Sequence, residues 1–302
     1  VRQESTVHNV VLEVVHGENY SKLNEEEKIA FLVNAPEVTA ANTYDNALVQ
    51  DTINNLKGIQ QIQKVNGEAG CNRYIISQSN SALNVLEVYG LFLSCGWKKE
   101  NLSVDIVPLF ETIDDLQHAA DIMKTLYSNE AYRKHLQLRS NRQTIMLGFS
   151  DGTKDGGYLM ANFSIYKAKE ALTKISAANN IDVVFFDGRG GPPARGGGKT
   201  HQFYASMGKN ISNKEIQLTI QGQTVSSNFG TIDSAQYNIE QLLHAGLSND
   251  LFSNKEITMQ QAEENLLQVL AKDSLDAYLA LKNHPDFMNY LSHISPVKFY
   301  SE

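Results

Sequence analysis

The sequence is poor in cysteine and contains no long apolar run. Cys71 and Cys95 are the only cysteines among 302 residues, and neither lies in a CxxC pair or at ligand spacing from a histidine. We therefore expect neither a zinc site nor a disulfide framework, but two buried free thiols, which suit a reducing cytoplasmic compartment. No run of about 18 apolar residues and no signal peptide occurs, so no membrane span is expected.

Basic residues are also in the minority. The chain has 26 Lys and Arg against 34 Asp and Glu, which gives a formal net charge of −8 at pH 7. Because nucleic acids and anionic membranes require an excess of basic residues on one face, we expect neither as a partner. A small anionic substrate is compatible with this composition if basic side chains cluster locally.

The apolar pattern divides the chain into two parts, which we expect to form a single domain over residues 1–302. From Arg2 to about Gly67 apolar residues recur at helical spacing, so residues 1–67 are predicted to be an all-helical flank. Residues 68–302 alternate short β-branched runs with longer amphipathic segments, which predicts parallel strands joined by helices. The predicted strands are Tyr74–Ser77, Ser103–Phe110, Thr144–Ser150, Asp182–Phe186 and Glu215–Ile220.

A polar residue ends or follows each predicted strand. These residues are Ser77, Glu111, Asp151, Asp187 and Gln221. In a parallel barrel or a doubly wound sheet, the carboxyl ends of the strands face one common mouth, where substrates bind. No GxGxxG motif opens the first strand–helix unit, so the α/β fold that we expect is a portion of a TIM-type (β/α) barrel with many additional helices.

The most unusual stretch is FFDGRGGPPARGGGKTH, Phe185–His201, which ends in Gly-Lys-Thr as a P-loop does. A P-loop needs a glycine five residues before Gly198, but Pro193 stands there and removes a backbone N–H. We therefore interpret the stretch as an anion clamp, in which the guanidinium groups of Arg189 and Arg195 bind phosphate or carboxylate oxygens. The alternative is a surface loop with solvated charges.

Two further motifs carry carboxylates behind strands. In GFSDGTKDGG, Asp151 can ligate a hard divalent cation and Lys154 supplies a positive charge for an anion. In VPLFETIDDL, Glu111 ends its strand in the same way, so the two carboxylates would converge on one Mg²⁺. The alternatives are an ordinary turn or helix start for the first motif, and helix capping by Glu111 and Thr112 for the second.

With these motifs in order, the chain resembles phosphoenolpyruvate carboxylase across nearly its whole length. The likeness is carried by VRQES, YIISQSNSALNVLEV, VPLFETIDDL, MLGFSDGTKDGGY, FFDGRGGPPARGGG, TIQGQ and SPVKFYSE. The resemblance implies an α/β barrel that carboxylates phosphoenolpyruvate with bicarbonate, giving oxaloacetate and phosphate through carboxyphosphate and a metal-stabilised enolate. It also implies Mg²⁺ or Mn²⁺ as the cofactor, a homotetramer at full length, and inhibition by aspartate or malate.

The resemblance further implies a metal site and a substrate site. The metal ligands would be Glu111 and Asp151. The substrate would be held by the first residues of the chain and by two loops, through Arg2, Lys154, Arg189, Gly190, Gly191 and Arg195. Among these, Lys154 and Arg189 would also act in catalysis, and Arg195 would take part in inhibition by aspartate.

Three departures from the family pattern affect these expectations. Asp187 stands at a catalytic position where the family usually has histidine, and we expect it to orient Arg189. Gln223 and Asn228 stand where the family prefers an acidic and a basic residue. The third departure is length: Val1 lies inside a helical pattern, and the family's catalytic histidine and further substrate arginines lie outside the sequence. We expect an internal piece of a longer protein.

Two functions therefore stay open. The first is the carboxylase reaction, with the 302-residue chain inactive by itself because part of the site is supplied elsewhere. The second is a non-catalytic, carboxylase-like module that binds a metal and a phosphorylated or dicarboxylate ligand. A P-loop nucleotide hydrolase is disfavoured by the proline at position 193.

Overall fold

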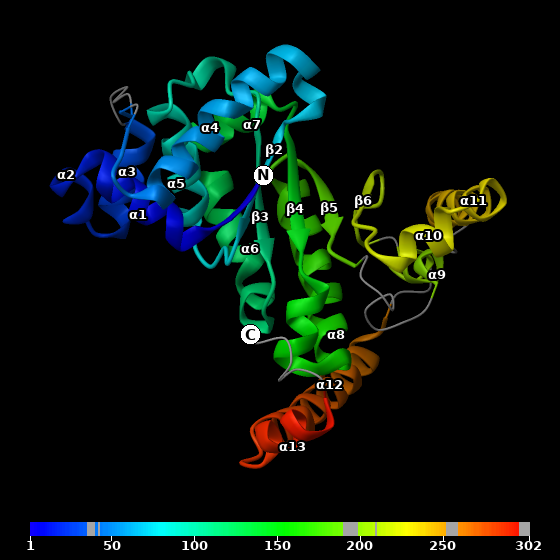
Figure 1. Ribbon diagram of the computed structural model, residues 1–302. Coiled ribbons are helices and arrows are strands. Elements are labelled where there is room, and N and C mark those ends of the chain that lie inside the picture. Colours follow the sequence, from blue (N-terminus) through cyan, green and yellow to red (C-terminus); the bar gives the residue numbers. More distant parts are fainter. Residues whose placement is uncertain (35–39, 42, 190–198, 209, 252–258, 296–302) are drawn as a thin grey trace.

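A parallel six-stranded sheet forms the centre of the protein (Figure 1). The computed structural model describes residues 1–34, 40–41, 43–189, 199–208, 210–251 and 259–295. The strands are β1 (Arg2–Glu4), β2 (Arg73–Ser77), β3 (Asp105–Phe110), β4 (Arg142–Leu147), β5 (Asp182–Asp187) and β6 (Ile216–Leu218). They lie in the order of the sequence, and each pairs in parallel with the next.

This strand order confirms the α/β class but not a closed barrel. A doubly wound sheet reverses its strand order at a switch point, whereas this sheet runs from β1 to β6 without reversal, as the wall of a barrel does. Among the described residues, β1 pairs only with β2 and β6 only with β5, so the sheet is open at both edges.

The prediction of an all-helical flank over residues 1–67 is wrong at its first residues. Arg2–Glu4 form β1, in which Arg2 pairs with Ile75 and Glu4 with Ser77. Three residues are too few to show the two-residue period of a strand, and this strand exists because it pairs with β2, far along the chain. The rest of the flank is helical as predicted, with α1 (Ser5–His16), α2 (Glu18–Ser21), α3 (Glu25–Asn34) and α4 (Ala47–Asn66).

The predicted alternation of strands and helices is confirmed beyond the flank. All five predicted strands are present, with ends that shift by up to three residues. The helices are α5 (Ala82–Ser94), α6 (Ile113–Ser128), α7 (Glu130–Leu138), α8 (Phe149–Ala178), α9 (Thr200–Ala205), α10 (Gln223–Phe229), α11 (Ile232–Leu251), α12 (Gln261–Lys282) and α13 (Phe287–Ile294), with 3₁₀ turns η1 (Glu68–Gly70) and η2 (Lys99–Asn101).

The two faces of the sheet carry different side chains. Successive residues of a strand point to opposite faces, so Ile106 and Phe110 of β3 join the large core with the helices, as do Ile145 and Leu147 of β4. The opposite face carries a small separate cluster of Ile75, Val107, Leu109, Met146 and Phe186. We call these the helix face and the inner face. A residue's position along its strand thus decides which side chains it can meet.

The cysteine and membrane expectations can be compared with the structure. Both thiols are free, and Cys95 is buried as predicted, but Cys71 is only partly buried. None of the helices in the described ranges carries an apolar stretch long enough to cross a membrane.

Candidate active site

Arg2 and Glu111 meet at the carboxyl end of the sheet on its inner face. Arg2 is paired in register with Ile75, whose side chain belongs to the inner face. Glu111 directly follows β3 and has the same alternation as Leu109, so it points to the same face. The Arg2 guanidinium donates to Glu111 Oε1 at 2.7 Å, and the backbone N–H of Gln78 approaches Oε2 at 3.4 Å. Two residues predicted to bind metal and phosphate are thus in direct contact.

Asp151 joins this pair from the first turn of α8. The Glu111 carboxyl shares a hydrogen bond with the Asp151 carboxylate, and Lys154 Nζ donates to Asp151 Oδ1 at 3.0 Å. Burial raises the pKa of Glu111, and the charge of Asp151 adds to this while Arg2 opposes it. Burial acts to raise the pKa of Asp151 as well, but Lys154, Glu111 and Arg2 together hold it below its usual value. The pKa values of the two carboxyl groups are thus shifted in opposite directions, because Glu111 is more buried and Asp151 has Lys154 as an additional partner.

A glycine allows the carboxylates to approach each other. A Cβ added to Gly148 would lie 2.9 Å from Glu111 Cγ and 3.1 Å from its Cα, and the backbone N–H of Gly148 donates to Phe110 O at 2.8 Å. A side chain at this position would force Glu111 to shift. The absence of a Cβ is thus part of how the sequence builds this site.

The alternative role of Glu111 was to cap the helix that follows it. Its neighbours cap that helix, and the Glu111 carboxyl group does not. Thr112 caps α6 by accepting from Asp115 N at 3.1 Å, and Asp115 accepts in return from Thr112 N at 3.0 Å. Asp155 accepts from Ile113 N at 3.0 Å. These contacts satisfy the first turn of α6, which leaves the Glu111 side chain to face Arg2 and Asp151.

Asp187 lies in a different environment from these residues. It is the last residue of β5, shares the alternation of Phe185 on the helix face, and is fully buried. Its Oδ2 accepts from Lys169 Nζ of α8 at 2.8 Å and from the Tyr204 hydroxyl of α9 at 2.8 Å. The structure therefore separates Asp187 from Arg2, Glu111 and Asp151, which lie toward the inner face.

Sequence reasoning did not identify Lys169 or Tyr204. A signal for Lys169 is present, because it falls on the buried stripe of α8 with Ala161, Ile165 and Leu172, and only 2% of its side chain is exposed. A lysine on such a stripe requires a buried acidic partner, and Asp187 supplies it. The partner could not be identified from spacing alone.

Arg189 lies two residues beyond Asp187 and is 5% exposed. Its guanidinium lies over the ring of Phe203 in α9, with Cζ 4.3 Å from the ring centroid. Burial lowers its pKa, and Tyr204, Tyr158 and Asp187 oppose that shift electrostatically. Gly190, Gly191 and Arg195, the other predicted residues of the loop, lie outside the described residues.

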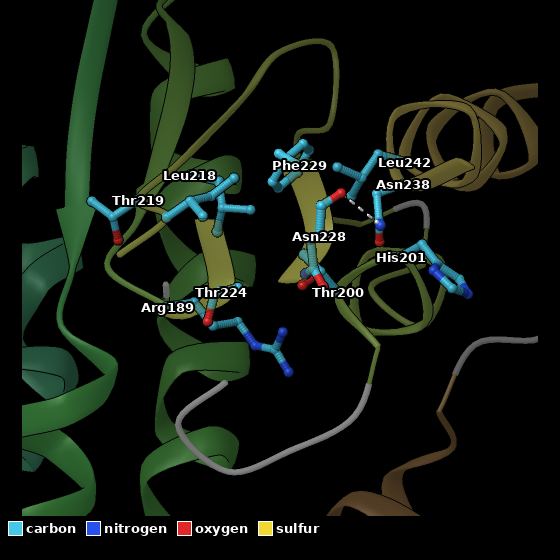
Figure 2. Close-up of a pocket in the computed structure, with 11 residues that line it drawn as sticks. Arg189, Thr200, His201, Leu218, Thr219, Thr224, Asn228, Phe229, Asn238 and Leu242 are labelled. Carbon is cyan, nitrogen blue, oxygen red and sulfur yellow. Dashed lines mark hydrogen bonds between the residues drawn. The ribbon is translucent and has the colours of Figure 1, made fainter. Parts of the chain in front are cut away.

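Arg189 also lines a pocket between β6 and the helices that follow the loop. Figure 2 shows Arg189 at one end of this pocket, with Thr224 of α10 above it and Asn228 farther along the same helix. Asn238 of α11 donates to Asn228 O at 3.1 Å, which ties the two helices together. The pocket does not include Glu111 or Asp151, so Arg189 is the only predicted site residue on its wall among those described.

The carboxyl groups of Glu111 and Asp151 suit one hard divalent cation. Within the described residues, no group of three or more His, Cys, Asp and Glu side chains converges. Two carboxylates with room for water and substrate oxygens are the ligands that Mg²⁺ usually takes from a protein, and they also suit Mn²⁺. Glu111 and Asp151 therefore fit such a cation.

The comparison with known proteins decides the family. Residues 1–302 match the family model of phosphoenolpyruvate carboxylase along their whole length. The chain belongs to the phosphoenolpyruvate carboxylase family. It is 30% identical over 315 residues to a phosphoenolpyruvate carboxylase of Prochlorococcus marinus (strain AS9601), and 31% identical over 315 residues to one of Corynebacterium diphtheriae.

These carboxylases are much longer than the chain. The matches cover 99% and 98% of the chain but only 32% and 34% of the two relatives. A carboxylase of Nitrosomonas eutropha gives the same result, with 30% identity, 99% of the chain and 34% of the relative. The chain thus spans about one third of the length of the phosphoenolpyruvate carboxylases that it matches.

Proposed function

We propose that this chain provides the metal-binding and part of the phosphate-binding site of a phosphoenolpyruvate carboxylase, the enzyme that joins phosphoenolpyruvate and bicarbonate to give oxaloacetate and phosphate. The observation that carries the proposal is the convergence of Arg2, Glu111, Asp151 and Lys154 from three separate elements. Membership of the family supports it.

The proposed roles follow from the charges of these side chains. Glu111 and Asp151 hold Mg²⁺ or Mn²⁺, which supplies positive charge to offset that of the phosphoryl group and of the enolate. Arg2 and Arg189 bind the phosphate oxygens, since a planar guanidinium matches two of them at once. Lys154 holds bicarbonate beside the phosphoryl group.

The reaction explains why several cations are needed. A bicarbonate oxygen forms a bond to phosphorus as the bond from phosphorus to the enol oxygen breaks, so two anions must approach each other. The carboxyphosphate so formed breaks the bond between its carboxyl carbon and its phosphate oxygen, which releases phosphate and carbon dioxide, and the enolate carbon then forms the new bond to carbon dioxide. Water must be excluded because it would protonate the enolate to pyruvate. Within the loop, we assign substrate contacts to Gly190, Gly191 and Arg195, and inhibition by aspartate or malate to Arg195.

One observation favours the second function, a non-catalytic carboxylase-like module. Asp187, where the family usually has histidine, is buried and bonded to Lys169 and Tyr204. It cannot present a cationic N–H to a ligand. On this hypothesis the chain binds a metal and a phosphorylated or dicarboxylate ligand without turnover.

Bicarbonate dependence separates the two functions. The protein as the cell makes it, which we expect to be a cytoplasmic tetramer, is supplied with phosphoenolpyruvate, Mg²⁺ and ¹³C-bicarbonate. A carboxylase releases phosphate only with bicarbonate present and incorporates the label into oxaloacetate. Tight binding of phosphoenolpyruvate without labelled product would establish the binding module instead. The 302-residue chain by itself is expected to form no oxaloacetate.

A further inference from the structure

The Lys169–Asp187 ion pair is deeply buried, and a gain in stability does not explain why. Its two side chains are 2% and 0% exposed, and Nζ and Oδ2 are 2.8 Å apart. Removing two charges from water costs about as much as their attraction returns, so an apolar pair of similar volume would stabilise the fold as well. In some proteins a buried pair of this kind fixes a specific geometry, and the surroundings of Asp187 indicate which geometry that is here.

Asp187 links the elements that surround Arg189. Its side chain binds Lys169 of α8 and Tyr204 of α9, while its backbone oxygen accepts from Thr219 N at 3.2 Å, just beyond β6. Burial and the neighbouring Asp187 raise the pKa of Tyr204, which keeps the hydroxyl protonated as a donor. A single carboxylate therefore holds α9 against α8.

The Phe203 ring connects this ion pair to Arg189. Phe203 precedes Tyr204 in α9, and its ring centroid lies 4.3 Å from the Arg189 guanidinium and 5.5 Å from Lys169 Nζ. Asp187 accepts its hydrogen bonds from Lys169 and Tyr204, so Lys169 supplies its counter-charge. The contribution of Asp187 to Arg189 is electrostatic.

We propose that Lys169 is a positioning residue for Arg189: it neutralises Asp187, which through Tyr204 seats the Phe203 ring on which the guanidinium lies. This inference rests on the proposed function, because it concerns how a phosphate-binding arginine is held. It also gives a physical reason for aspartate at position 187. A histidine there would lie beside the buried ammonium group of Lys169 and could not serve as its counter-ion.

The test observes the Arg189 side chain directly by NMR spectroscopy, in the absence of ligand. The chain has seven arginines, so its Nε–Hε signals form a small set, and the Arg189 signal is assigned by its loss in R189K. The ring current of Phe203 changes the chemical shift of this signal. The F203L variant gives the chemical shift of the Arg189 signal in the absence of the ring. We expect K169M to move the Arg189 signal toward the F203L position. The matched control K174M, on the exposed side of the same helix, should leave the signal in place.

A second variant keeps the test decisive if K169M folds poorly. Y204F removes only the hydroxyl that donates to Asp187, and it should move the Arg189 signal in the same direction. An unchanged Arg189 signal in a folded K169M or Y204F protein, even with a lower melting temperature, would show that the ion pair is merely structural and overturn the inference. Titration with phosphoenolpyruvate and Mg²⁺ is read separately: absence of binding by the wild type would count against the proposed function, whereas the ligand-free signals test the positioning.

Discussion

The guanidinium of Arg2 donates to the carboxylate of Glu111 at 2.7 Å, although 109 positions separate the two residues in the chain. The contact joins the first strand to the end of the third and places a cation beside the pair of carboxylates. About half of the Arg2 side chain is exposed, whereas the Glu111 side chain is largely buried. The arginine is thus reachable by a ligand while it is anchored by the carboxylate.

Arg2→Ala should weaken binding of phosphoenolpyruvate in the presence of Mg²⁺. A charge-assisted hydrogen bond contributes about 1.5–3 kcal/mol, so the dissociation constant should rise roughly 10- to 100-fold. Arg2→Lys should recover part of the loss, because it keeps the charge but not the planar fork. Calorimetric titration measures the affinities, with the exposed Arg133→Ala as the matched control. Equal affinities of the wild type and Arg2→Ala for phosphoenolpyruvate would show that Arg2 does not bind its phosphate group.

Gly148→Ala should disturb the carboxylate pair from the backbone side. The new methyl group would lie 2.9 Å from Glu111 Cγ and 3.1 Å from its Cα, so the strand end must move. We expect a loss of about 1–3 kcal/mol in the free energy of unfolding, as for other overpacked sites. Gly58→Ala is the control, since nothing lies within 4 Å of its added Cβ in α4, and alanine should stabilise that helix by up to about 1 kcal/mol. Urea denaturation measures the free energy of unfolding of each variant and of the wild type. Equal values for Gly148→Ala and the wild type would show that glycine is not required at position 148.

Lys169 and Asp187 should behave as a coupled pair in a double-mutant cycle. Lys169→Met or Asp187→Asn alone leaves one buried charge without its partner, and each should cost about 3–5 kcal/mol. The double variant removes both charges and should recover most of that loss. Asp187→His, which introduces the residue usual in the family, should be destabilising alone and less so with Lys169→Met. Strictly additive losses in urea denaturation would mean that the two charges do not interact.

Ionisation of Glu87 should make the free energy of unfolding depend on pH, and Glu87→Gln should abolish this contribution. Burial raises its pKa from 4.5 to about 6, against the hydrogen bonds from Tyr20 and Asn84. The folded state therefore holds a proton that the unfolded state has lost, so this contribution is present below pH 4.5 and disappears as the pH rises through about 6. Relative to wild type, Glu87→Gln should gain about 2 kcal/mol between pH 4 and pH 7.5.

The comparison with a variant is necessary because buried histidines act in the opposite direction. Burial lowers the pKa values of His8 and His135 to about 4, so their contribution to stability is lost as the pH falls from 6.5 toward 4. Burial also lowers the pKa of His16. These contributions cancel when Glu87→Gln is subtracted from wild type at each pH. Glu26→Gln, on the exposed surface, should show no such pH-dependent gain. A difference that stays constant from pH 4 to pH 7.5 would contradict the assignment to Glu87.

The sequence was most informative where a local pattern determines the structure. β-Branched runs predicted five strands, and the convergence of Glu111 and Asp151 could be predicted as well, because the carboxyl ends of parallel strands share one edge. The three residues of β1 could not be predicted, since their structure depends on a partner far along the chain. The same holds for Lys169 and Tyr204: their role depends on which face Asp187 points to, and that follows from register rather than from composition.

Manganese binding tests the central claim most directly, because it depends on Glu111 and Asp151 together. Free Mn²⁺ is followed by electron paramagnetic resonance as the chain is titrated, with and without phosphoenolpyruvate. We predict one Mn²⁺ per chain, with the affinity reduced about tenfold or more in both Glu111→Gln and Asp151→Asn, and unchanged in Asp114→Asn, which alters an exposed neighbouring carboxylate. Wild-type affinity in Glu111→Gln, or no binding by the wild type, would contradict the metal site on which the proposed carboxylase function depends.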